Sequence, residues 1–142
     1  MRVKKLRPNA RLPVYGSAEA AGADIFACLE EPVTIGPGRT VMIPTGLAME
    51  IPNGYAGLVY ARSGMATKQG LAPANKVGVV DSDYRGEWFV ALHNHDAEPR
   101  VVEPAQRIAQ LVITPVLREV FVEADALEET RRGAGGFGST GK

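Results

Sequence analysis

The sequence predicts an all-β protein, a sandwich, jelly roll or barrel built from many short strands. Two observations predict it. Short runs rich in β-branched residues recur along the 142 residues, and the 16 glycines and 10 prolines are scattered between them. Short strands at close spacing, separated by turn signals, are typical of these architectures. A chain of this length is expected to form one domain with its own core.

The expected strands are short, and turn residues lie between them. Turn sequences at residues 35–38 (Ile-Gly-Pro-Gly) and 52–54 (Pro-Asn-Gly) separate successive runs. One short helix is expected after Ser63, over residues 64–69, with Gly70 as its stop. It is too short to be more than a local cap on a β structure. The expected strands are residues 33–35, 39–43, 57–60, 77–80, 88–92, 100–102, 108–115 and 120–122.

Composition narrows the function classes. Lys+Arg and Asp+Glu both number 16, so the net charge is zero, which argues against a general binder of nucleic acid or membrane surfaces. A local cationic site for a phosphorylated small molecule remains compatible with this balance. Cys28 is the single cysteine, expected to be buried. No signal peptide or membrane-spanning run is visible, and a cytoplasmic protein is expected.

The last residues differ in kind from the rest. We divide the chain into a β domain, residues 1–129, and a flexible glycine-rich C-terminal arm, residues 130–142. The arm cannot fold by itself, so it is either a disordered tail or a segment that orders over a ligand. It matches G-x-G-x-x-G and G-x-x-x-x-G-K, but the strand and helix that these phosphate loops need are missing, which excludes both. Its glycines, with Arg132, Ser139 and Thr140, still offer donors for an anion.

Residues 61–64, Ala-Arg-Ser-Gly, lie where a strand ends and the short helix begins. Ser63 suits the N-cap position. The same geometry, with free N–H groups, a hydroxyl and the Arg62 guanidinium, also suits a phosphate. Both interpretations stay open from the residues alone.

Residues 75–87 are interpreted as a β-hairpin whose turn is residues 82–86. Acidic residues in turns are usually turn formers, and Asp83 is interpreted so. Asp81 ends an apolar run, which favours a carboxylate at the rim of a cavity and makes it a candidate for catalysis. His93 and His95 lack further metal ligands and are interpreted as surface residues. Trp88 is expected in the core or an interface.

These clusters, taken in order, resemble the five motifs of the trimeric deoxyuridine triphosphatase (dUTPase) family. The resemblance covers residues 21–141, nearly the whole chain. One departure is visible, because the family usually has an acidic residue where this chain has Gln106. The matching segments are residues 21–25 (AGADI), 62–66 (RSGMA), 75–87, 107–111 (RIAQL) and 132–141.

The resemblance implies a β jelly roll that assembles as a homotrimer and hydrolyses dUTP to dUMP and pyrophosphate with Mg²⁺. This reaction keeps uracil out of DNA and supplies dUMP for thymidylate synthesis. Each active site would take the hairpin from one subunit, motifs two and four from a second, and the arm from the third. No nucleic-acid or membrane partner is implied.

The resemblance also implies roles for particular residues. Asp81 would orient the attacking water and accept its proton, and Tyr84 would exclude a ribose 2′-hydroxyl. Asp24 would contact magnesium through water. The base would be bound by Asn75, Gly78, Val79, Val80 and Phe89, with Phe137 stacked over it. The phosphates would be held by Arg62, Ser63, Gly64, Gln110, Arg132, Ser139 and Thr140.

Two rival functions share the scaffold. A dCTP deaminase would have a glutamate at the position of Ala91, usually Phe at that of Tyr84, and no glycine-rich arm. A non-catalytic nucleotide-binding protein would have lost Asp81 or the arm. Both rivals are disfavoured by the residues present.

Overall fold

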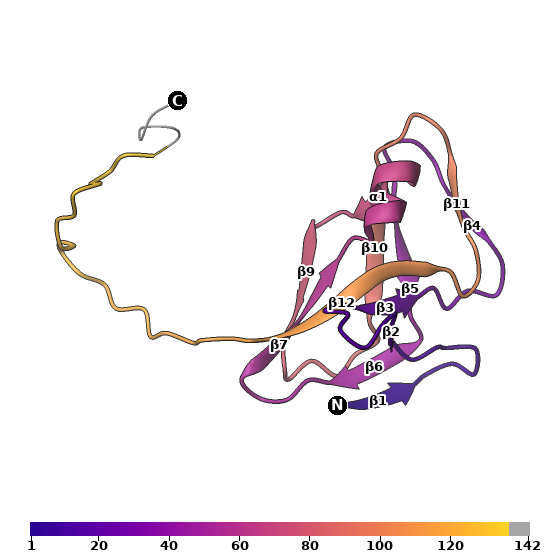
Figure 1. The fold of residues 1–142 in the computed structure, drawn as a ribbon, viewed down its shortest axis with the longest axis horizontal. Helices are drawn as coiled ribbons and strands as arrows, with labels where there is room; N and C mark the ends of the chain where they lie inside the picture. The colour runs from indigo at the N-terminus through magenta and orange to yellow at the C-terminus, as the bar shows by residue number, and fades with distance from the viewer. Residues whose placement is uncertain (137–142) are drawn as a thin grey trace.

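The expected all-β architecture is confirmed. The computed structural model describes residues 1–136, and strands account for most of its regular structure (Figure 1). The elements are β1 (Arg2–Lys5), β2 (Val14–Tyr15), β3 (Ala23–Phe26), β4 (Val33–Ile35), β5 (Thr40–Pro44), β6 (Leu47–Glu50), β7 (Tyr55–Tyr60), α1 (Ser63–Gln69), β8 (Leu71–Pro73), β9 (Val77–Val80), β10 (Phe89–Asn94), β11 (Arg100–Val102) and β12 (Arg107–Pro115).

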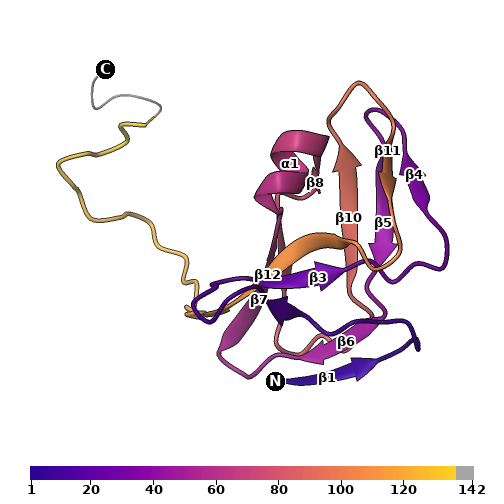
Figure 2. The same cartoon turned by 45° about the vertical axis from the view of Figure 1, so that its right-hand side comes forward.

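The strands pair antiparallel, mostly with partners distant in sequence. The largest sheet has the order β2-β3-β12-β7-β9, and a second has the order β5-β10-β8. Two further pairs, β1-β6 and β11-β4, complete the body (Figures 1 and 2). Such long-range pairing is what separates a jelly-roll-like body from a row of simple hairpins.

The core lies between these sheets. Along β10 the burial alternates, so that Val90, Leu92 and Asn94 face inward while Phe89 and His93 do not. Removing a large apolar side chain from water stabilises a fold by about 1.5–3 kcal/mol. The largest fully buried apolar side chains are Ile25, Ile35, Ile43, Leu47, Met49, Leu71, Leu92, Ile108, Leu111 and Val102.

Of the predictions for single segments and residues, the helix and the burial of Cys28 are correct and the last strand is wrong. The helix is confirmed, and Gly70 ends it in the left-handed conformation, with φ of 63°. The predicted burial of Cys28 is also confirmed, at 2% exposure. The strand expected at residues 120–122 is wrong, since these residues are exposed and unpaired. A β-branched run forms a strand only where another strand can bond to it.

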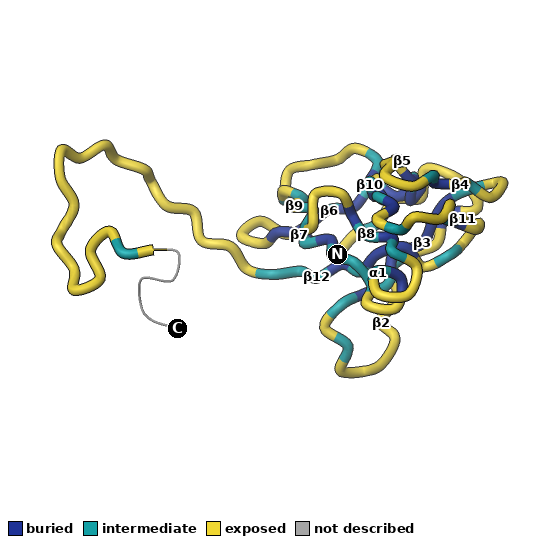
Figure 3. The backbone as a smooth tube through the Cα atoms, turned by 90° about the horizontal axis from the view of Figure 1, so that it is seen from above, coloured by how far each residue is buried: buried dark blue, intermediate teal, exposed yellow. Residues whose placement is uncertain are grey.

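After β12 the chain leaves the body. Residues 116–136 contain no strand or helix and run outward from the end of β12 (Figures 1 and 3). Leu117 is 93% exposed and Phe121 is 97% exposed. The chain therefore presents apolar side chains that its own body does not cover. Among residues 1–136, no helix is long and apolar enough to cross a membrane.

Candidate active site

The hairpin expected at residues 75–87 is wrong in its pairing. β9 bonds to β7 in the large sheet, whereas β10 bonds to β5 and β8 in the second sheet. The connection between them therefore crosses from one sheet to the other. The closeness of the two strands in the sequence suggested that they pair with each other. Instead, β9 pairs with β7 and β10 pairs with β5, so the two strands diverge.

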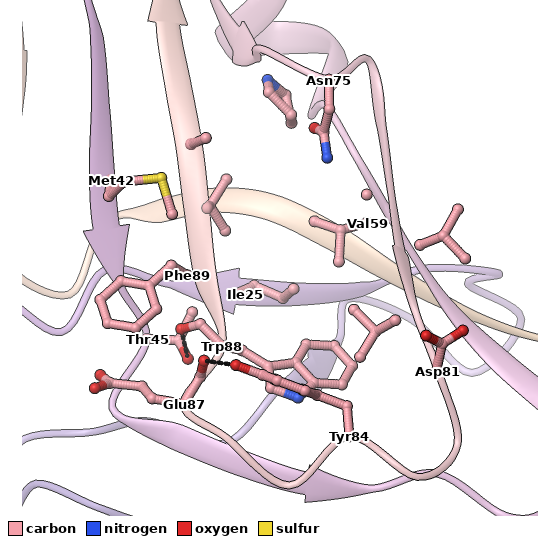
Figure 4. Close-up of a pocket in the computed structure, with 16 residues that line it drawn as sticks. Ile25, Met42, Thr45, Val59, Asn75, Asp81, Tyr84, Glu87, Trp88 and Phe89 are labelled. Carbon is pink, nitrogen blue, oxygen red and sulfur yellow. Dashed lines mark hydrogen bonds between the residues drawn. The ribbon is translucent and has the colours of Figure 1, made fainter.

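A cavity of about 340 Å³ opens between the diverging strands. Figure 4 shows it with Asn75 at one end, Asp81 beside β9, and Phe89 on the opposite wall. The cavity collects the described residues that we predicted for the base and sugar, together with Asp81. Its lining includes Asn75, Gly78, Val79, Val80, Asp81, Tyr84 and Phe89. Met42, Thr45 and Ala91 also line it, although no local sequence signal identified Met42 or Thr45.

The cavity is flanked by backbone that no strand covers. β9 is the edge strand of its sheet, and β8 covers β10 only over Leu92–Asn94. The β9-facing side of Phe89 and Val90 is left without a strand partner. Edge strands present unpaired N–H and C=O groups. A planar molecule with a hydrogen-bonding edge can therefore take the place of a missing strand.

Tyr84 is packed on its own turn. Its backbone N–H donates to the carbonyl of Asp81 at 3.2 Å, and its hydroxyl donates to the carbonyl of Glu87 at 3.0 Å. A Cβ at Gly86 would come within 2.7 Å of the Tyr84 ring carbon Cζ, so a side chain there would have to displace the ring. Trp88 lines the same cavity and is 4% exposed, which confirms its predicted burial. The tyrosine ring is thus fixed at the cavity wall.

A second cluster forms where β3, β12 and β7 lie side by side. The Asp24 carboxylate accepts from Arg62 Nε at 2.7 Å and from Arg107 NH1 at 3.2 Å. Its side chain is only 16% exposed, which strengthens both ion pairs. Gln110 lies opposite Asp24 in the ladder and donates from Nε2 to the Ala61 carbonyl at 2.8 Å. Motifs one, two and four therefore form one bonded unit.

Ser63 does not cap the helix. Arg62 occupies the N-cap position with extended backbone, and no side chain accepts a capping hydrogen bond from the first helical N–H groups. Ser63 is the first helical residue, so its geometry does not suit the N-cap, which was one of the two interpretations left open by the sequence. Its exposed hydroxyl is left for other contacts.

A hollow of about 310 Å³ lies beside this cluster. It is cationic, because Arg62, Lys68 and Arg107 line it together with Gly64 and Gln106. Sequence reasoning missed Lys68 and assigned no role to Arg107. The signal for Arg107 was its place at the head of the motif at residues 107–111. The Gln106 side chain accepts the Glu103 N–H at 2.7 Å, a bond that an acidic residue would also make.

The two cavities share no lining residue. Arg132 lies in the outward segment, where its Nε donates to the Gly135 carbonyl at 2.9 Å. The remaining arm residues of the prediction, Phe137, Ser139 and Thr140, lie outside the described residues. Among residues 1–136, a single copy of the chain therefore does not bring all the predicted site residues into one cavity.

The histidines form a small pair of their own. His93 and His95 rings are 4.4 Å apart, and His93 Nδ1 lies 2.9 Å from Thr40 Oγ1. Burial and the neighbouring His93 lower the pKa of His95. Within residues 1–136, no group of three or more His, Cys, Asp or Glu side chains could hold a metal ion.

Comparison with known proteins identifies the family of this chain. The dUTPase family model matches residues 8–141. The deoxyuridine 5'-triphosphate nucleotidohydrolase of Desulfitobacterium hafniense (strain DSM 10664 / DCB-2) is 56% identical over 132 residues, which cover 92% of this chain and 87% of that protein. The protein of the same name from Syntrophotalea carbinolica is 48% identical, covering 99% of this chain and 96% of its own.

Solved structures of dUTPases are also similar to this chain. A dUTPase of Staphylococcus bacteriophage 80alpha, solved with dUpNHpp, superposes with a TM-score of 0.85 at 30% identity, covering 99% of this chain and 98% of that one. The dUTPase of phage phi11 of S. aureus, with a structural Mg(II) ion, has a TM-score of 0.79 at 27% identity, covering 90% of this chain and 98% of its own. The chain therefore belongs to the dUTPase family, and it hydrolyses dUTP to dUMP and pyrophosphate.

Proposed function

We propose that Asp81 is the catalytic carboxylate and that each active site is assembled from three copies of the chain. The separation of the two cavities supports this proposal most strongly. One cavity holds Asp81 with the base- and sugar-binding candidates, and the other holds the phosphate-binding candidates Arg62 and Gly64. A nucleotide bound in the first cavity would have its phosphates held by the phosphate-binding surface of another copy.

Uracil would bind along the uncovered backbone of the first cavity. Its edge presents an acceptor, a donor and an acceptor, which backbone groups of Val79, Val80 and Phe89 and the Asn75 amide can match. Gly78 leaves room for the close approach of the base, since a Cβ there would lie 3.4 Å from Asn75 Nδ2. Cytosine would leave buried polar groups unpaired, and sites of this kind discriminate by about 10⁴–10⁵.

Thymine and ribose would be excluded by shape. A base bound between β9 and β10 would leave no room for a methyl group at carbon 5, and the Tyr84 ring would fill the space that a 2′-hydroxyl needs. Ala91 lines the same cavity and brings no group that transfers protons. This methyl side chain supports hydrolysis of a uracil nucleotide rather than deamination of a cytosine nucleotide.

The phosphates would be held by the second cluster of a neighbouring copy. Arg62 supplies charge, Ser63 a free hydroxyl, and Gly64 a backbone without a side chain; a Cβ at Gly64 would meet nothing within 4 Å. Gln110 would donate the amide hydrogen that its bond to Ala61 leaves free. These donors fix the triphosphate so that the α-phosphorus faces Asp81.

Asp81 would then orient a water in line with the α-phosphorus and accept its proton. The water oxygen bonds to that phosphorus as the bond to the bridging α–β oxygen breaks, and pyrophosphate leaves with the electron pair. A carboxylate is a weak base, so alignment and neutralisation of phosphate charge supply most of the rate.

The chemistry of Asp24 fits outer contact with magnesium. Both of its oxygens already accept from arginines, and each keeps a further lone pair that can accept from a water. Mg²⁺ keeps several waters and binds substrate phosphates readily. The ion, when bound, would neutralise phosphate charge, and Asp24 would hold one of its waters.

The outward segment supports a homotrimer with exchanged arms. Leu117 and Phe121 gain stability only if another surface covers them. We propose that this surface belongs to another copy of the chain. The arm of residues 130–142 would then reach an active site on the neighbouring copies. There Arg132, Ser139 and Thr140 would close on the phosphates and Phe137 would stack on uracil.

Two variants test Asp81 and the shared site. Asp81→Asn should keep dUTP binding, measured through fluorescence of the single Trp88, and lose most pyrophosphate release. Full activity in this variant would sink the assignment. Co-purified mixtures of Asp81→Asn and Arg62→Gln chains, each inactive alone, should regain partial activity, because some sites then combine two intact halves. No regained activity would contradict shared sites.

A further inference from the structure

One side chain ties the active-site turn to the body of the protein. Glu87 Oε1 accepts the backbone N–H of Gly46 at 3.0 Å, and Oε2 pairs with Arg7 NH2 at 3.3 Å. The Glu87 side chain is 17% exposed and lines the cavity that holds Asp81. A partly buried, charge-assisted bond of this kind is stronger than a surface ion pair.

The attachment point is rigid. Gly46 lies between β5 and β6 with φ of 68°, a conformation that glycine adopts readily. A Cβ on Gly46 would lie 2.6 Å from the Cys28 sulfur and 2.8 Å from Ala10 Cβ, so the backbone is pressed against the core. The carboxylate of Glu87 is therefore bound to a part of the structure that has little room to shift.

The other end of Glu87 holds Tyr84. The Glu87 carbonyl accepts the Tyr84 hydroxyl at 3.0 Å (Figure 4), and the ring lies against Gly86. One residue thus joins a fixed point in the core to the ring at the cavity wall.

The strand that follows is held independently. The Trp88 N–H donates to the Leu47 carbonyl at 2.9 Å, and the Trp88 carbonyl accepts from Thr45 Oγ1 at 2.8 Å. The Glu87 carbonyl shares a peptide group with this Trp88 N–H, so removing the Glu87 carboxylate should leave that carbonyl and β10 in place. What it should free is the main chain of the turn from Asp81 to Gly86, which carries Tyr84. The expected change is local to the cavity wall.

We propose that Glu87 is a positioning residue that sets the sugar specificity of the enzyme by holding the Tyr84 ring where a ribose 2′-hydroxyl would collide. The inference rests on the proposed role of Tyr84 at the sugar. With the carboxylate gone, the ring gains freedom, and UTP is hydrolysed better relative to dUTP.

The test compares kcat/KM for dUTP and UTP in the native chain, Glu87→Ala, Glu87→Gln and Arg7→Gln. Glu87→Ala should lower the dUTP-to-UTP ratio about tenfold, because it removes steric discrimination rather than a base contact. Glu87→Gln keeps an acceptor for Gly46 and should rescue the ratio to within about threefold. Arg7→Gln removes only the charge partner and serves as the matched control.

Other variants distinguish the possible failures. A lower melting temperature in Glu87→Ala with an unchanged ratio would mean a purely structural role and overturn the inference. Tyr84→Phe, which loses the bond to Glu87 but keeps the ring, should also lower the ratio, and it serves if Glu87→Ala does not fold. If Tyr84→Ala lowers the dUTP-to-UTP ratio while the Glu87 variants and Tyr84→Phe do not, the role of Glu87 is refuted and the role of Tyr84 at the sugar stands. An unchanged ratio in Tyr84→Ala would remove the sugar role of Tyr84 as well.

Discussion

Replacing Asp24 by Asn tests whether the ion-paired cluster is the frame of the phosphate site. Asn keeps the volume and one acceptor oxygen, but its amide nitrogen then faces the donor of Arg107. The bond from Arg62 is charge-assisted, at 2.7 Å between partly buried groups, and such a bond contributes about 1.5–3 kcal/mol. The pair with the half-exposed Arg107 adds about 0–1 kcal/mol.

The retained acceptor offsets about 0.5–1.5 kcal/mol of this, so the net loss in the free energy of unfolding should be about 1–3 kcal/mol. Urea denaturation at fixed protein concentration measures it. Because Arg62 loses its fixed position, KM for dUTP should also rise, and the Mg²⁺ concentration for half-maximal activity should rise if Asp24 holds a magnesium water.

Arg107→Gln is the matched control, since it breaks only the weaker pair and should leave the Mg²⁺ dependence unchanged. A double-mutant cycle between Asp24 and Arg107 isolates their coupling. An Asp24→Asn variant with the native urea midpoint and the native KM would refute the reasoning.

Three further predictions concern stability and reactivity. Gly57→Ala should cost about 1–3 kcal/mol by overpacking, read from the urea midpoint, because the new Cβ would lie 2.9 Å from the Trp88 ring; an unchanged midpoint would show that the core can yield. Burial raises the pKa of the Cys28 thiol, so a thiol reagent should react only after denaturation, and rapid labelling of the native protein would argue against this burial. The side-chain bond from Arg100 lowers the pKa of Asp96, so this carboxyl stabilises the fold above its unfolded-state pKa, and the contribution is lost as the pH falls through the folded-state pKa. The melting temperature of Asp96→Asn should therefore depend less on pH across the acid range than that of the native chain. The same slope of melting temperature against pH in both proteins would contradict this prediction.

Several site features were predictable because they depend on local chemistry. Asn75, Asp81 and Tyr84 belong to one continuous segment whose residue types resemble a family motif, and they do line one cavity. The helix end at Gly70 was predictable for the same reason, since the left-handed conformation is favourable for glycine. The role of Glu87 was not, because its partner Gly46 is distant in sequence and no pattern links the two.

The sequence by itself determined the strand-rich fold class, the order of the motifs and the kind of chemistry at each, because these follow from residue type and short-range pattern. Tertiary structure alone decided that β9 and β10 join different sheets, that a cavity opens between them, and that Asp24 meets both Arg62 and Arg107. The physical reason is that strand partners are chosen by burial and hydrogen bonding across the whole chain. A short run of residues therefore does not specify which distant strand will pair with it.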